Sequence, residues 1–377
     1  MPIRLGVPKE TQENERRVAL VPAVVDRFVK LGVQVLVETG AGAGSYYNDA
    51  AYGSATVVAS AAELYGQADL IVKVQPPTEA EIGLLKEGTA IAGMMLPHRF
   101  PERVELLRDR KILSFAMELI PRISRAQSMD VLSSQAAVAG YKAALMAADR
   151  SGGFFPMLTT AAGTIRPAKV LVIGAGVAGL QAIATVRRLG AMVEGYDVRG
   201  ATREQVESLG AKFVDTGVSA EGSGGYAREL TAEEKQQQQE VLEKHIVAAD
   251  AVITTAAIPG RPSPRIISKA VVEQMKAGAV IIDLAAEGGG NCEVTEPGKQ
   301  IVHGQTIVYG PLNVPSELAV HASEMYAKNL LNFLTPMIKD GEFRPDWDDE
   351  VIADSTLTRD GEIRHAPTRE LVEGKAS

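Results

Sequence analysis

Short apolar runs alternate with segments of helical periodicity along the first part of the chain. The runs are rich in β-branched residues, which is typical of buried strands, and between them apolar residues recur every three or four positions, as in helices. We expect strands at Ile3–Val7, Val33–Glu38, Asp69–Val74, Gly88–Met95 and Ile112–Met117. The expected helices are Pro22–Leu31, Ser60–Tyr65, Glu79–Lys86 and Pro101–Asp109. This alternation predicts βαβ units and a parallel sheet.

A second alternating series begins at Pro167, after an alanine-rich helical segment at residues 130–149. Its expected strands are Lys169–Ile173, Met192–Tyr196, Lys212–Val214, Ala251–Thr254, Ala279–Leu284 and Gln305–Tyr309. An amphipathic helix at Ser316–Ile338 is expected to return the chain to the first domain. The pattern predicts an α/β protein of two Rossmann-like domains with parallel sheets, joined by long linker helices around a cleft. The expected domains are residues 1–128 completed by 318–377, and residues 129–317.

Two segments interrupt this order. Residues 216–229 are polar and rich in glycine, so we expect a mobile surface loop there. The charged helix expected at Thr231–Val247 follows, and Gln236–Gln239 is interpreted as its solvated face. The tail after Trp347 lacks periodicity and is expected to be extended.

Composition narrows the classes of function. Hydrophobic residues make up 46% and charged residues 23%, as in ordinary globular proteins. The net charge of −8 disfavours binding to nucleic acid or to an anionic membrane. The single cysteine, Cys292, excludes an internal disulfide and favours an intracellular compartment. No apolar stretch approaches the ~20 residues that span a bilayer, and the N-terminus lacks the apolar region of a signal peptide.

The strongest motif follows the expected strand Lys169–Ile173. Residues 174–179 read Gly-Ala-Gly-Val-Ala-Gly, and a helix is expected at Leu180–Leu189. Gly174 permits a tight turn, Gly176 lets a pyrophosphate approach the backbone, and Gly179 lets helix and strand pack closely. In this strand–turn–helix context the motif predicts a dinucleotide site, the alternative being a purely structural glycine turn.

The next strand ends at Asp197, 23 residues after Gly174. A carboxylate at that place is suited to accept a hydrogen bond from the adenosine ribose 2′-hydroxyl. It favours NAD over NADP, because a 2′-phosphate would meet a negative charge. Arg199, two residues further on, keeps NADP open as an alternative.

A polar cluster closes the first domain. Arg122, Gln127, Asp130 and Ser133 bring together the donors and acceptors that could orient a nicotinamide carboxamide. Asp130 could equally cap the following helix, with Arg122 as its surface partner. Tyr226, in the glycine-rich loop, could close over a nucleotide or pack locally.

Other catalytic centres have little support. The five histidines are scattered, and no spacing suits a metal. His98 and His321 are interpreted as structural residues, and no nucleophile elbow occurs.

Three N-terminal segments carry a family resemblance: Val7–Thr11, Glu15–Leu20 and Gly40–Gly44. They resemble the shared pattern of alanine dehydrogenases and proton-translocating NAD(P) transhydrogenases, and the similarity continues to about residue 340. In the alanine dehydrogenase pattern Arg17 matches the carboxylate-binding arginine, but Gln75 replaces a lysine and Glu287 replaces an aspartate. The family's histidine has only a displaced counterpart, His98. Since an amide cannot replace a proton-transferring lysine, we expect no amino-acid oxidation.

The transhydrogenase pattern fits better. Its Arg…Gln…Asp loop is matched by Arg122, Gln127 and Asp130, its Gly-Tyr-Ala loop centre by 225–227, and its Thr-Thr-Ala…Ile-Pro-Gly segment by 254–260. Arg122, Gln127, Asp130 and Tyr226 are the residues implied to act in the reaction. The resemblance implies that NAD(H) is bound by Arg122, Ser124, Gln127, Asp130, Ser133, Gly174, Ala175, Gly176, Val177, Gly179, Asp197, Val198, Arg199, Gly225, Tyr226, Gln238 and Ala257.

The implied role is that of the NAD(H)-binding first portion of a transhydrogenase alpha subunit, encoded apart from the rest. NADH held here would give hydride to NADP⁺ on a partner subunit, coupled to proton translocation, and no general base would be needed. The implied partners are a second copy of the chain and the membrane-spanning and NADP(H)-binding subunits, at the cytoplasmic face of the inner membrane. A stand-alone amino-acid dehydrogenase and a non-catalytic NAD-binding protein are the alternatives.

Overall fold

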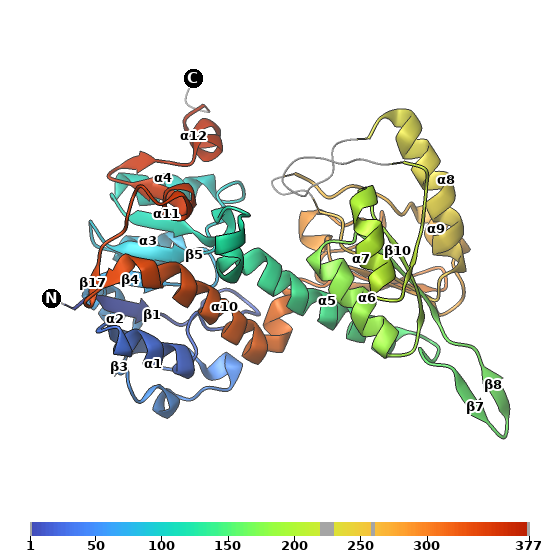
Figure 1. Ribbon diagram of the computed structural model, residues 1–377, viewed down its shortest axis with the longest axis horizontal. Helices are drawn as coiled ribbons and strands as arrows, with labels where there is room; N and C mark the ends of the chain where they lie inside the picture. The colour runs from blue at the N-terminus through green and yellow to red at the C-terminus, as the bar shows by residue number, and fades with distance from the viewer. Residues whose placement is uncertain (1, 219–229, 258–260, 375–377) are drawn as a thin grey trace. The chain divides into compact units, whose positions relative to one another are not determined.

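The computed structural model describes residues 2–218, 230–257 and 261–374. The chain divides into two compact units. Unit 1 comprises residues 1–135 and 316–377, and unit 2 comprises residues 136–315. Each unit is built around its own mainly parallel sheet (Figure 1).

Unit 1 contains an eight-stranded sheet in the order β19-β18-β6-β5-β4-β1-β2-β3. Its strands are β1 Arg4–Val7, β2 Gln34–Glu38, β3 Thr56–Val58, β4 Leu70–Val72, β5 Ala90–Gly93, β6 Leu113–Ala116, β18 Thr356–Arg359 and β19 Glu362–Ile363. Its helices are α1 Pro22–Lys30, α2 Ala61–Gln67, α3 Glu79–Leu84, α4 Pro101–Asp109, α10 Ala319–Leu334, α11 Glu350–Ser355 and α12 Ala366–Glu373. Strands β1 to β6 are parallel, and the inner strands are buried on both faces: in β2, Val35 and Val37 join one hydrophobic cluster and Leu36 the other.

The prediction of an extended tail after Trp347 is wrong. The segment forms α11, β18, β19 and α12, and β18 and β19 continue the sheet in antiparallel direction. Without β18 the backbone of β6 would be left as an open edge. Leu357 is fully buried and the hydroxyls of Ser114 and Thr358 lie 2.6 Å apart. Elements this short contain too few residues for a periodic pattern to emerge.

The predicted bounds of a single helix at Ser316–Ile338 are also wrong, because α10 covers only Ala319–Leu334. Val314–Leu318 and Thr335–Met337 are 3₁₀ turns around α10, and Ile338–Lys339 (β16) pairs with Glu342–Phe343 (β17). Pro336 explains the C-terminal break, because it lacks an N–H group and restricts the residue before it.

Unit 2 contains a seven-stranded sheet in the order β11-β10-β9-β12-β13-β15-β14, in which only the edge strand β14 is antiparallel. Its strands are β9 Lys169–Ile173, β10 Met192–Tyr196, β11 Lys212–Phe213, β12 Ala251–Thr254, β13 Val280–Asp283, β14 Gln300–His303 and β15 Thr306–Tyr309. Its helices are α5 Val131–Arg150, which begins in unit 1, α6 Val177–Arg188, α7 Arg203–Ser208, α8 Ala232–Ala248 and α9 Lys269–Gln274.

The strand order of unit 2 identifies where a ligand would bind. From β9 the chain moves outward to β10 and β11, and then crosses back to β12 on the other side of β9. Such a reversal opens a crevice at the carboxyl ends of the two central strands. The segments that follow Ile173 and Thr254 therefore form the expected binding edge.

One element of unit 2 was not expected from the sequence. Leu158–Thr160 (β7) and Gly163–Ile165 (β8) form a two-stranded antiparallel hairpin that Figure 1 shows extending away from the sheet of unit 2. Every residue of both strands is exposed.

Candidate functional site

The glycine turn lies at the carboxyl end of β9. Gly174 has a φ of +94°, and a Cβ there would lie 2.5 Å from the Thr255 Oγ1 atom. A Cβ at Gly179 would lie 1.7 Å from the Gly174 carbonyl oxygen. A Cβ at Gly176, by contrast, would have no heavy atom within 4 Å. The first and third glycines are therefore required by packing, and the second leaves open space.

Helix α6 begins immediately at this open space. It starts at Val177, earlier than the expected Leu180, and its N-cap residue is Gly176, which has no side chain to cap the helix. The first backbone N–H groups of a helix have no partner within the helix, and they carry the positive end of its dipole. This arrangement suits a phosphate group.

Asp197 connects the end of β10 to the glycine turn. The residue is only 7% exposed, and its Oδ2 atom accepts a hydrogen bond from the Ala175 N–H at 2.8 Å. The side chain of Arg199 pairs with the same carboxylate at 2.7 Å. Val198, between them, packs against the neighbouring hydrophobic cluster.

A second group of predicted residues meets in unit 1. Arg122, Gln127, Asp130 and Ser133 line one cavity of about 400 Å³, together with Pro121, Ile123 and Ala126. The 3₁₀ segment Ser124–Met129 forms part of it, although Ser124 itself does not line the cavity. This segment is anchored to α10, because the Ser128 carbonyl accepts hydrogen bonds from the amides of Asn329 and Asn332.

Asp130 caps α5 as well as lining the cavity. Its carboxylate accepts hydrogen bonds from the Ser133 N–H at 2.9 Å and the Ser133 Oγ at 2.5 Å. The capping alternative is therefore realised, and it holds the carboxylate and the hydroxyl in one fixed arrangement.

The remaining predicted residues lie at several places. Gln238 on α8 is buried, so the interpretation of Gln236–Gln239 as a solvated face is wrong for this residue, while Gln237 donates a hydrogen bond to the Thr216 carbonyl. Ala257 is exposed after β12. Gly225 and Tyr226 lie outside the described residues, as do 219–229 and the Ile-Pro-Gly part of the 254–260 segment.

Known protein families match both halves of the chain. The profile described as alanine dehydrogenase/PNT, N-terminal domain, matches residues 6–139, and the C-terminal domain profile matches residues 143–366. The chain belongs to the alanine dehydrogenase/PNT family. The resemblance and the fold class expected from the sequence are thereby confirmed.

Relatives within this alanine dehydrogenase/PNT family bear two kinds of name. A Rhodospirillum rubrum protein, named as the first portion of NAD(P) transhydrogenase subunit alpha, is 50% identical, covering 96% of this chain and 98% of its own. The crystal structure of a transhydrogenase from Sinorhizobium meliloti superposes with a TM-score of 0.87 at 43% identity, covering 96% of this chain and 99% of its own. Alanine dehydrogenase 2 of Staphylococcus aureus is 32% identical, covering 78% of this chain and 75% of its own.

Arg17 and Gln75, which were compared above with the alanine dehydrogenase pattern, both contact Glu15. The Arg17 guanidinium pairs with Glu15 at 2.7 Å and donates to Gln135, and the Gln75 amide donates to Glu15 at 2.7 Å. Burial alone would raise the pKa of Glu15, but the Arg17 ion pair and the Gln75 hydrogen bond lower it to about 2. Arg17 is therefore neutralised by a carboxylate of its own chain.

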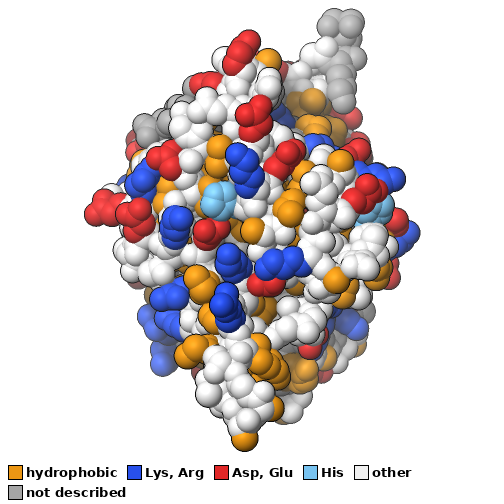
Figure 2. All heavy atoms as spheres, turned by 90° about the vertical axis from the view of Figure 1, so that its right-hand side faces the viewer, with side chains coloured by type: hydrophobic (Ala, Val, Ile, Leu, Met, Phe, Trp, Pro, Cys, Tyr) orange, Lys and Arg blue, Asp and Glu red, His pale blue; other side chains and the backbone are white. Residues whose placement is uncertain are grey.

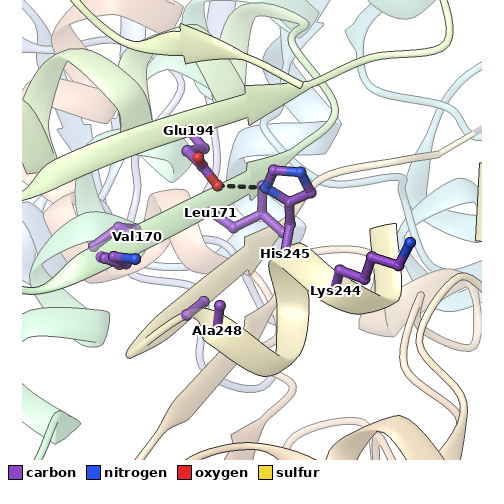
Figure 3. A pocket seen from close by; sticks show the side chains of 8 residues that line it. Val170, Leu171, Glu194, Lys244, His245 and Ala248 are labelled. Atoms are coloured by element: carbon purple, nitrogen blue, oxygen red, sulfur yellow. Dashed lines mark hydrogen bonds and ion pairs between the residues drawn. The ribbon is translucent and has the colours of Figure 1, made fainter. Parts of the chain in front are cut away.

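A second hollow, of about 210 Å³, lies in unit 2 near the start of β9 (Figure 3). His245 Nδ1 lies 2.6 Å from Glu194 Oε2 at its wall, and Lys244 points away from that pair. This hollow is at the opposite strand end from the glycine turn, so it is separate from the edge where a nucleotide is expected.

Two features are absent from the part of the chain that the structure describes, metal-binding clusters and membrane-spanning helices. No group of three or more His, Cys, Asp or Glu residues there could hold a metal ion, and no helix there is long and apolar enough to cross a membrane. Burial raises the pKa of the Cys292 thiol to about 11, which disfavours a nucleophilic thiolate.

The structure reveals one supporting residue that the sequence did not single out. A Cβ at Gly140 of α5 would lie 2.0 Å from the Ala178 carbonyl in the first turn of α6. Gly140 thus permits two helices to meet at the glycine turn. Its position as the one glycine in an alanine-rich helix was the available signal, since glycine there costs helix stability unless packing requires it.

We predict that Gly179→Ala destabilises unit 2 by about 1–3 kcal/mol, because the added methyl group overlaps the Gly174 carbonyl. Gly176→Ser is the matched control, since its Cβ has open space and serine is a preferred N-cap. Thermal unfolding followed by circular dichroism should show a lower Tm for Gly179→Ala alone. Equal melting temperatures for the two variants would contradict this packing argument.

Proposed function

We propose that this chain is the NAD(H)-binding component of a proton-translocating NAD(P) transhydrogenase. The observation that carries the proposal is a glycine turn with a buried aspartate at the strand-order reversal of unit 2. Relatives named NAD(P) transhydrogenase subunit alpha support it at up to 50% identity over almost the whole chain.

The adenosine half of NAD(H) is assigned to unit 2. The open space at Gly176 and the start of α6 would receive the pyrophosphate, with Ala175 and Val177 beside it. Asp197 and Val198 would contact the adenosine ribose, Arg199 would lie beside it, and Gln238 and Ala257 would lie near the nucleotide. The roles of Gly225 and Tyr226 stay predictions from the family resemblance.

The nicotinamide is assigned to the cavity of unit 1. The Arg122 guanidinium, the Gln127 amide and the Asp130 carboxylate that line it offer donors and acceptors for a carboxamide. The bond from Ser133 fixes the Asp130 carboxylate, so this side of the cavity is organised in advance.

When bound, NAD(H) supplies the hydride chemistry, with NADP(H) on a partner subunit as the acceptor. The side chains of this chain would orient the ring and exclude water. Since hydride transfer removes no proton from a hydroxyl or an amine, the scheme requires no general base.

The amino-acid dehydrogenase alternative is disfavoured by contacts in each unit. In unit 1 Gln75 replaces the lysine of that pattern, and Arg17 is already paired with Glu15. In unit 2 Glu287 replaces the aspartate and accepts a hydrogen bond from the Asn313 N–H. A substrate carboxylate would have to displace an ion pair that is almost fully buried.

The proposed partners are a membrane-spanning subunit, an NADP(H)-binding subunit and a second copy of this chain. The complex would place the chain peripherally at the cytoplasmic face of the inner membrane. The β7–β8 hairpin supports the second copy, because Ile165 on it is 47% exposed and Met157, just before it, is 63% exposed, with the exposed Phe154 close by in the sequence. Figure 2 shows hydrophobic side chains gathered where this hairpin projects. Exposed apolar clusters of this kind mark protein interfaces.

The proposed reaction is tested by mixing the purified chain with an isolated NADP(H)-binding transhydrogenase domain and measuring reduction of a spectrally distinct NADP⁺ analogue by NADH. We expect hydride transfer that depends on both proteins, and no hydride transfer from L-alanine to NAD⁺. Arg122→Ala should slow transfer about a hundredfold, because a misplaced reactant loses roughly that much. Arg125→Ala is the matched control: Arg125 lies on the same segment but pairs with Asp349 and does not line the cavity.

Two outcomes would overturn this function. Nucleotide binding and complex formation without transfer would favour a non-catalytic NAD-binding protein. Alanine-dependent reduction of NAD⁺ by the chain alone would favour the dehydrogenase.

The proposed homodimer is tested with the double variant Met157→Asp/Ile165→Asp. Sedimentation velocity should show a dimer for the unaltered chain and a monomer for this variant, because two buried charges would oppose the contact. Leu84→Asp, at an exposed apolar residue of unit 1, should remain dimeric. A dimer that survives the double substitution would exclude the hairpin as its interface.

A further inference from the structure

The carboxylate of Asp197 is saturated with hydrogen bonds from its own chain. Its Oδ1 atom accepts from the Arg199 backbone N–H at 2.9 Å and from Arg199 Nε at 2.8 Å. Its Oδ2 atom accepts from the Ala175 N–H at 2.8 Å and from Arg199 Nη2 at 2.7 Å. A carboxylate offers about four acceptor sites in all, so none is left for a ribose hydroxyl.

The four donors differ in how easily they can move. The two N–H groups belong to the backbone of the glycine turn and of the strand end, which packing holds in place. The two guanidinium bonds come from a long side chain that is 22% exposed. A ribose that reaches Asp197 must therefore replace the Arg199 side chain.

We propose that Arg199 competes with the adenosine ribose for Asp197 and thereby sets both the affinity for NADH and the preference for NADH over NADPH. This inference rests on the proposed nucleotide site. The guanidinium holds the carboxylate until ribose hydroxyls replace its two hydrogen bonds. Part of the binding free energy of NADH is used to break this ion pair.

The displaced guanidinium has a second effect on selectivity. A 2′-phosphate would meet the negative charge of Asp197, which opposes NADPH, and the positive charge of Arg199, which attracts it. The preference for NADH is then a balance between two side chains two residues apart. Removal of Arg199 leaves only the repulsion, so affinity for NADH increases and affinity for NADPH decreases.

The test compares Arg199→Met and Arg199→Ala with the unaltered chain in NADH and NADPH titrations followed by calorimetry. Methionine keeps an apolar stem, so agreement between the two variants separates charge from packing. We expect NADH to bind about fivefold more tightly, since a partly exposed ion pair contributes roughly that factor. The ratio of NADPH to NADH dissociation constants should rise about tenfold. Salt screens the ion pair between Arg199 and Asp197. The gain in NADH affinity caused by the Arg199 substitutions should therefore be smaller at a salt concentration of about 0.5 M.

Arg203→Ala is the matched control, because Arg203 pairs with Asp215 and has no bond to Asp197. It should leave both affinities unchanged. Unchanged or weaker NADH binding by the Arg199 variants would overturn the competition, and an unchanged NADPH-to-NADH ratio would overturn the selectivity role. Absence of NADH binding by the unaltered chain would instead contradict the proposed function itself.

Discussion

The close approach of helix α6 to the turn at Gly174 is the constraint on which the proposed site depends. A methyl group at Gly179 would lie 1.7 Å from the Gly174 carbonyl, and Gly140 of α5 meets the same helical turn. This packing brings the first N–H groups of α6 to the end of β9. It also places the Ala175 N atom 2.8 Å from the Asp197 Oδ2 atom. The proposed phosphate-binding turn and the proposed ribose-binding carboxylate therefore belong to one packed arrangement.

The sheets of the two units begin with the same strand order, but different residues lie where that order reverses. In both, the chain moves outward over three strands and then crosses back beside the first one. In unit 1 the crossing point is filled by Lys73, which is 1% exposed and lies 3.1 Å from Glu10 and 2.8 Å from Glu81. Glu10 also accepts a hydrogen bond from the Val74 N–H, so a buried cluster of charged side chains occupies this point in unit 1. Unit 1 instead offers a cavity beside the start of α5.

Sequence periodicity predicted the central strands well, because strands buried on both faces are continuous apolar runs. Lys169–Ile173, Met192–Tyr196 and Ala251–Thr254 are confirmed to the residue. Sequence periodicity did not predict the β7–β8 hairpin or the C-terminal elements. Their strands are two to four residues long and depend on neighbours distant in sequence. For the candidate site, sequence brought out Asp197 and Arg122, but not that Arg199 saturates Asp197, since only coordinates show which acceptors are occupied.

The proposed function depends on direct hydride transfer from NADH on this chain to NADP⁺ on a partner subunit. The most direct measurement uses NADH deuterated at the transferred C4 position, with the reconstituted proteins in ordinary water and mass spectrometry of the NADPH formed. We expect NADPH that carries one deuterium per transfer, because no solvent proton enters the step. NADPH without deuterium would show that its hydrogen came from another source and would exclude direct transfer between the two nucleotides.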